Sequence, residues 1–208
     1  MRVVVIYVTM KLRDADQDDA INNVHAFAAE LNHGRAKDPS IGEFIVLDRK
    51  RVDLSPTLTI LGATLWSQLN PDDLDILRWG VTDFRAIHGF TPERYVELHN
   101  TDLAWFNAEV ERIRVHDPDR QVVVFIHHAP AMHGTADPKY AGGPSESAFA
   151  TVLVGQKCWG DPVKVWVFGH THWSCDFVKD GIRVVSNQRG YSKGDASWDP
   201  EFVLQLSS

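Results

Sequence analysis

The sequence predicts an α/β protein in which helices and strands form layers, and three observations support this fold class. Apolar runs typical of buried strands alternate with amphipathic stretches typical of helices. The chain has 208 residues, enough for one domain with a sizeable core and too few for two comfortable domains. Its 44% hydrophobic and 24% charged residues are ordinary for a globular protein and exclude the disordered and fibrous classes.

Two long helices and one short helix are expected. Residues 16–31 place apolar side chains on one helical face. A second helix is expected to run to about residue 114, with Thr91 as its cap and Pro92 in its first turn. Residues 147–154 are expected to form the short helix.

Strands are expected wherever a short apolar run lies between turn signals. In chain order these runs are residues 1–8, 44–47, 58–63, 121–126, 163–168, 173–178, 182–186 and 202–206. Lys179-Asp180-Gly181 predicts a hairpin between residues 173–178 and 182–186. The polar residues 49–53 are expected to form a turn, and the Gly- and Pro-containing residues 129–146 a loop.

Charge and cysteine usage limit the function classes. A formal net charge of -7 argues against nucleic acid as a partner, because such binding needs a basic surface. A phosphorylated substrate remains open, since a bound cation can supply local positive charge. Cys158 and Cys175 lie in different apolar stretches, which favours a reducing compartment. No apolar stretch has transmembrane length, so we expect a soluble cytoplasmic protein without a membrane partner.

Histidines follow two of the predicted buried strands. His127 and His128 come directly after residues 121–126, and His170 and His172 come after residues 163–168 and Gly169. Side chains at strand ends are held rigidly, and neutral imidazole is a good ligand for zinc, manganese or iron. Gly169 is expected to allow the tight turn that brings His170 and His172 toward one point. These histidines therefore predict a metal site, and separate surface histidines are the alternative interpretation.

In this arrangement the sequence resembles the calcineurin-like metallophosphoesterases. The matching motifs are His127-His128-Ala129-Pro130, Gly169-His170-Thr171-His172, Val184-Val185-Ser186-Asn187-Gln188-Arg189-Gly190-Tyr191, Leu61-Gly62-Ala63-Thr64-Leu65-Trp66 and Asp83-Phe84-Arg85. The resemblance implies a four-layer αββα sandwich, with His127 and His170 on one metal ion and His172 on the other. Three residues are candidates for substrate binding: His128, Arg85 and Arg189. An arginine side chain can bind two phosphate oxygens at once. For both arginines, a structural salt bridge is the alternative.

Three further motifs of that family, D-x-H, G-D-x-x-D and G-N-H-E/D, do not occur in the sequence. Leu31-Asn32-His33-Gly34 is the nearest string and is interpreted as a helix terminus. We therefore expect residues 1–208 to form a single, N-terminally incomplete or truncated domain that holds at most one metal ion. We also expect an open edge at residues 121–126 or 163–168, filled in part by residues 1–8, and self-association through exposed core.

Three functions follow from these expectations. The first is a metal-dependent phosphoester hydrolase acting on a phosphorylated small molecule or phosphoprotein, with impaired or no activity in this chain. The second is a non-catalytic metal- or partner-binding protein of the same fold. The third is a single-zinc hydrolase using His127, His170 and His172. Metal stoichiometry and turnover distinguish the three.

Overall fold

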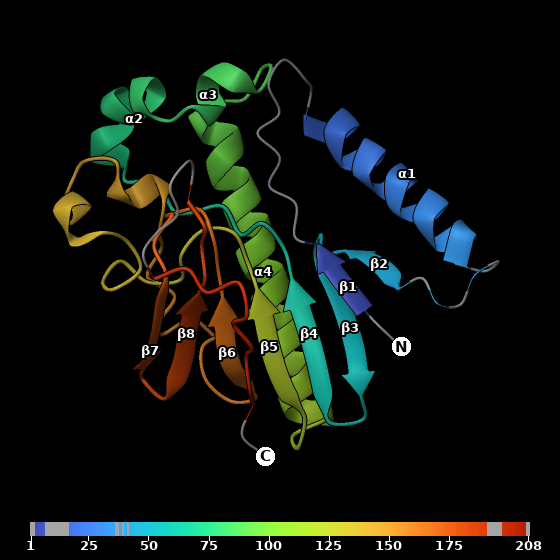
Figure 1. The fold of residues 1–208 in the computed structure, drawn as a ribbon. Helices are drawn as coiled ribbons and strands as arrows, with labels where there is room; N and C mark the ends of the chain where they lie inside the picture. The colour runs from blue at the N-terminus through green and yellow to red at the C-terminus, as the bar shows by residue number, and fades with distance from the viewer. Residues whose placement is uncertain are drawn as a thin grey trace.

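A computed structural model describes residues 3–6, 17–35, 38, 40, 42–190 and 197–206, and it confirms the α/β class. A six-stranded mixed sheet with the order β3-β4-β5-β6-β8-β7 forms its centre (Figure 1). These strands are β3 Lys50–Ser55, β4 Leu58–Gly62, β5 Gln121–Phe125, β6 Val163–Val167, β7 Cys175–Lys179 and β8 Ile182–Ser186. The four central strands β4, β5, β6 and β8 are parallel, so their carboxyl ends meet at one edge of the sheet.

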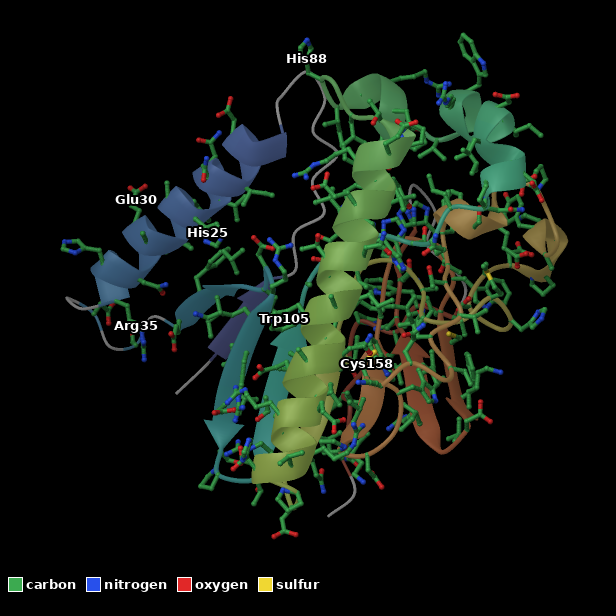
Figure 2. All side chains as sticks on the ribbon, turned by 180° about the vertical axis from the view of Figure 1, so that it is seen from behind. His25, Glu30, Arg35, His88, Trp105 and Cys158 are labelled. Atoms are coloured by element: carbon green, nitrogen blue, oxygen red, sulfur yellow. The ribbon has the colours of Figure 1, made fainter. Side chains whose placement is uncertain are left out.

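One face of this sheet is covered by the long helix α4, Pro92–His116 (Figures 1 and 2). Its predicted start is confirmed, since the Thr91 side chain accepts a hydrogen bond from Arg94 N. The helix buries Phe106, Val110 and Ile113 against apolar side chains of the central strands. This contact is the main core of the protein, and it fixes α4 against the strands that end in histidines.

The opposite face carries a small second sheet and the first helix. Strands β1, Val3–Ile6, and β2, Glu43–Val46, pair in parallel, and α1, Gln17–Arg35, lies beside β2 (Figure 1). Asn32 in the last turn of α1 makes two hydrogen bonds with the backbone of Phe44, at 2.8 and 2.9 Å. Ile45 and Leu47 pack against Ile60 of the large sheet. The layers are therefore α4, large sheet, small sheet and α1, a partial four-layer αββα sandwich.

The strand pairing corrects one expectation. Strand β1 pairs with β2 and not beside β5 or β6. Both β5 and β6 have partners on each side, so the predicted open edge at these strands is wrong. The edges of the large sheet are β3 and β7, each the antiparallel arm of a hairpin. The β7–β8 hairpin is confirmed, and its turn places Asp180 and Gly181 at φ of 48° and 80°.

Other local expectations differ as well. Residues 50–53 do not form a turn but belong to β3, whose polar side chains suit an edge strand, while Arg49 lies in a bend with a left-handed φ of 42°. Residues 147–154 form no helix beyond the single turn η3, Glu146–Ala148, and residues 202–206 form no strand. Two short helices were missed, α2 Leu74–Gly80 and α3 Asp83–Ala86. Residues 1–2, 7–8, 16 and 191 of the predicted elements and motifs lie outside the described residues.

Within the described part of the chain, no helix combines the length and the apolar character that crossing a bilayer requires.

Candidate metal centre

Three histidines meet where two neighbouring parallel strands end. His127 and His128 follow β5, and His170 follows β6, which pairs with β5 up to Phe125 and Val167. His127 Nε2 lies 2.8 Å from His170 Nδ1, and the ring centres of His128 and His170 are 4.3 Å apart. One possible ligand nitrogen from each ring lies within 4.8 Å of the other two. Strand pairing thus produces a cluster of three potential metal ligands, called here the histidine cluster: His127, His128 and His170.

His128 is the most buried member, with 2% of its surface exposed. Its Nδ1 lies 3.1 Å from the Ala148 carbonyl oxygen, which can only accept, so Nδ1 carries the hydrogen and donates it. Tyr95 Oη donates to the same carbonyl at 2.8 Å and holds it in place. This tautomer leaves a lone pair on Nε2, which is buried and has no hydrogen-bond partner among the described residues. A buried nitrogen in that state is costly unless a ligand satisfies it.

Aromatic rings pack against two members of the histidine cluster. Phe149 stacks on His170 with ring centres 4.7 Å apart, and Trp66 lies 5.2 Å from His128. Burial is the main cause that holds the pKa of both His127 and His128 well below the usual histidine range, and the neighbouring imidazoles lower it further. The rings are therefore neutral near pH 7, which is the form that binds a metal ion.

The turn that carries His170 is strained. His170 and His172 adopt left-handed φ angles of 66° and 53°, which cost energy for any residue with a Cβ. Gly169 does not adopt such an angle, and a Cβ there would lie 3.5 Å from His127 Nδ1, an ordinary contact. The expectation that Gly169 makes the tight turn possible is therefore wrong. The strain is borne by the histidines themselves.

Gln188 holds this turn from the other side. Its Oε1 accepts a hydrogen bond from His172 N at 2.7 Å. Its Nε2 lies 3.0 Å from both Thr171 Oγ1 and the Trp173 carbonyl oxygen, and it donates to these groups. One side-chain amide thus fixes three consecutive residues next to His170.

A second segment, residues 63–70, lines the histidine cluster after β4. The Thr64 carbonyl oxygen accepts a hydrogen bond from His127 N at 3.1 Å. Leu65 has a left-handed φ of 46°, and its N donates to the Asp102 carboxylate of α4 at 2.8 Å. Burial raises the pKa of Asp102, and an ion pair with Arg49 at 2.7 Å opposes that rise. A buried charge on α4 thus positions the backbone beside His127.

The other residues singled out in the sequence make different contacts. His172 is exposed and is not among the three grouped ligands, although its charge contributes to the lowered pKa of His127. Arg85 donates to the Trp79 carbonyl oxygen on the surface. The Arg189 guanidinium lies 5.6 Å from the centre of the Trp198 ring. The third place in the histidine cluster belongs to His128, which sequence reasoning had assigned to substrate binding.

Comparison with known proteins shows the fold and leaves the family open. No family model matches the chain. The uncharacterized protein L509 of Acanthamoeba polyphaga mimivirus is 25% identical over 193 residues, covering 88% of this chain and 67% of L509. The crystal structure of the phosphopantetheinyl hydrolase PptH from Mycobacterium tuberculosis has a TM-score of 0.54 and 15% identity, covering 85% of this chain and 70% of PptH. The chain therefore shares its fold with a hydrolase.

Proposed function

We propose that this protein is a metal-dependent phosphoester hydrolase that binds one divalent ion through His127, His128 and His170. Two observations carry this proposal: His128 Nε2 is buried with no hydrogen-bond partner in the described structure, and one nitrogen from each of three histidine rings converges on one place. The hydrogen bond from His128 Nδ1 to the Ala148 carbonyl is the outer contact that metal-binding histidines commonly make.

The donor set suits one ion of zinc, manganese or iron. Three neutral imidazoles leave a coordination position open for water or substrate, as in catalytic zinc sites. Among the described residues, the grouped ligands include no aspartate or glutamate, so the set suits one ion better than two. When bound, such an ion lowers the pKa of a water ligand and polarises a phosphoryl oxygen.

The protein's own residues would orient and shield the reacting groups. Tyr95 and Ala148 fix the His128 ring, while Phe149 and Trp66 pack against His170 and His128. His172, which is exposed and close enough for its charge to lower the pKa of His127, would contact the phosphoryl group of a bound ester. The name of PptH refers to a phosphopantetheinyl group, but fold alone does not fix a substrate, so the proposed class remains phosphoesters.

Metal analysis of the purified chain, with phosphatase assays on p-nitrophenyl phosphate, tests this function. We expect one ion per chain, slow hydrolysis that a chelator abolishes, and loss of both in His128→Ala. His88→Ala is a matched control, since His88 is exposed in the turn before α4 (Figure 2). A chain that retains no divalent ion would contradict the proposal.

A second candidate function rests on the same donor set. Because no carboxylate joins the three grouped histidines in the described structure, a non-catalytic metal-binding protein of this fold is the alternative. One ion bound by the histidine cluster, with no hydrolysis of any phosphoester tried, would favour that alternative.

A further inference from the structure

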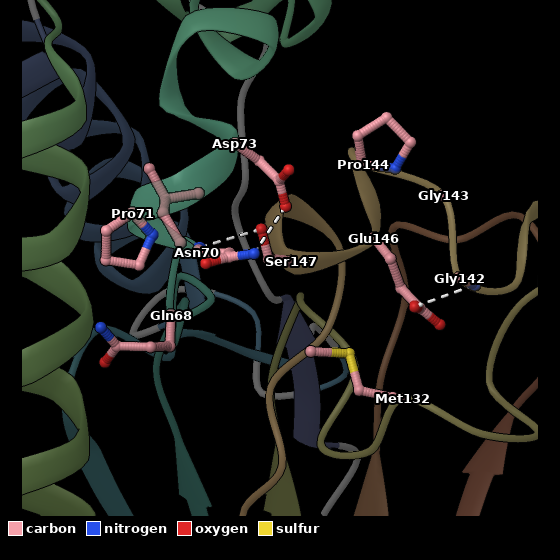
Figure 3. A pocket seen from close by; sticks show the side chains of 11 residues that line it. Gln68, Asn70, Pro71, Asp73, Met132, Gly142, Gly143, Pro144, Glu146 and Ser147 are labelled. Carbon is pink, nitrogen blue, oxygen red and sulfur yellow. Dashed lines mark hydrogen bonds between the residues drawn. The ribbon is translucent and has the colours of Figure 1, made fainter.

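An open pocket of about 630 Å³ is lined by residues 68–71, Asp73, Met132, residues 142–144, Glu146 and Ser147 (Figure 3). Met132 on one wall belongs to the segment that leaves β5 through His127 and His128. Ser147 on another wall directly precedes Ala148, whose carbonyl accepts from His128. Two lining residues are therefore close in sequence to His128 or to its hydrogen-bond partner Ala148.

Hydrogen bonds between distant segments hold the pocket walls in place. Asn70 N donates to Ser147 Oγ at 3.0 Å, and Gln68 N donates to Thr151 Oγ1 at 2.7 Å. Ala129 N donates to the Phe149 carbonyl oxygen at 2.9 Å. The three segments that form the pocket are thus tied to one another and to the histidine-bearing strand.

The pocket lining has a distinctive chemistry. Among the described residues of the lining, the charged side chains are the half-buried carboxylates of Asp73 and Glu146, and none is a lysine, arginine or histidine. Asp73 accepts a hydrogen bond from Asn70 Nδ2 at 2.7 Å, and Glu146 accepts one from Gly142 N at 3.1 Å. Both partners are uncharged amides, so they leave the two negative charges in place. Leu69, Pro71, Met132 and Pro144 supply apolar surface.

We infer that this pocket binds the alcohol part of the substrate and accepts an uncharged or positively charged organic group while rejecting an anionic one. The assignment of this pocket to the alcohol that hydrolysis releases rests on the proposed function. Its selectivity for charge does not depend on that function. Two carboxylates, with no cation among the lining residues that the structure describes, repel a second negative group and attract ammonium or hydroxyl donors. The substrate class is then a phosphate monoester of a neutral or amino alcohol, and not a bisphosphate or a nucleoside polyphosphate.

Met132 gives a direct probe of occupancy. The chain has three methionines, so the ¹³C-methyl resonance of Met132 can be assigned with Met132→Leu. The probes are three compounds of the same shape: choline, 3,3-dimethylbutan-1-ol and 3,3-dimethylbutanoate. We expect choline and the neutral alcohol to shift the Met132 resonance, and the anion to bind about 10-fold more weakly or worse, because both carboxylates repel it.

Isosteric variants test the cause of this selectivity. The double variant Asp73→Asn, Glu146→Gln keeps the shape of the lining, and we expect the three affinities to converge to within about 3-fold. The unperturbed methyl spectrum of the free variant checks that it is folded. A Met132 response equal or stronger for the anion, no response to any probe, or unchanged selectivity in the double variant overturns the inference. Failure of the proposed function is distinguishable, because metal content and phosphatase activity are measured separately.

Discussion

Replacing Gln188 with methionine tests how the protein holds the strained turn after β6. Methionine keeps the length of the side chain and removes the amide. The variant therefore loses the Oε1 acceptor for His172 N at 2.7 Å. It also loses both hydrogens of Nε2, which Thr171 Oγ1, the Trp173 carbonyl and Ser186 Oγ share at 3.0, 3.0 and 3.1 Å. The fold around the turn keeps its apolar contacts, so the change isolates the contribution of the amide.

The expected magnitude follows from the structure. Left-handed backbone costs on the order of 1 kcal/mol for each non-glycine residue, and therefore about 2 kcal/mol for His170 and His172 together. Each hydrogen bond of Gln188 contributes about 1 kcal/mol net, so three of them roughly offset this strain. Without them the turn relaxes and His170 no longer faces His127. We expect the affinity for a divalent ion to fall about 10- to 100-fold, as for other residues that orient metal ligands.

A cobalt(II) titration against a competing chelator measures this loss, because the visible absorption bands report the ligand geometry. Gln188→Glu keeps the acceptor for His172 N and should give an intermediate affinity. Gln156→Met is the control, since Gln156 is also half-buried and accepts one hydrogen bond from Asn107 at 3.4 Å. A folded Gln188→Met variant with the wild-type cobalt affinity and spectrum would refute the reasoning.

Two further predictions concern stability. Burial lowers the pKa of His99 below its ordinary value of 6.5, as it does for two histidines of the cluster. Below pH 6.5 the unfolded chain therefore binds more protons than the folded chain, and stability falls with acidification by about 1.4 kcal/mol per pH unit for each such histidine. Urea denaturation in a chelator should show this slope, and His99→Gln should remove one histidine's share; an unchanged slope contradicts the assignment. Gly62→Ala should destabilise the protein by about 1–3 kcal/mol, because the new Cβ would lie 2.6 Å from Leu47 Cδ1. In the same urea assay Gly80→Ala, which meets nothing within 4 Å, should change stability by no more than about 0.5 kcal/mol.

The sequence predicts the buried elements of this fold better than its surface elements. A buried strand has a continuous apolar run in its sequence, and a helix packed on a sheet has an apolar stripe. These patterns predicted strands β4, β5, β6 and β8 and helix α4. Strand β3 was missed because an edge strand carries polar side chains; Arg51 and Asp53 there pair with each other at 2.8 Å. The partner of β1 was also missed, since an apolar run specifies burial and not which strand it pairs with.

The histidine cluster could be predicted only in part. His127 and His170 were found because they follow apolar runs that form neighbouring strands. The orientation of the His128 ring depends on contacts with Tyr95 and Ala148, which are distant from it in sequence. A short motif around His128 therefore does not indicate that it is a metal ligand. The exposure of His172 follows from a left-handed turn built from non-glycine residues, which sequence patterns do not indicate.

The pairing of β5 with β6 also has a consequence for folding kinetics. The β3–β4 and β7–β8 hairpins join residues that are near in sequence, whereas β5 meets β4 and β6 only after long loops have closed. Closing a long loop costs entropy before any contact compensates for it, so such ladders form late. The three histidines then meet only after the slow step. A bound ion should therefore slow unfolding much more than it accelerates refolding.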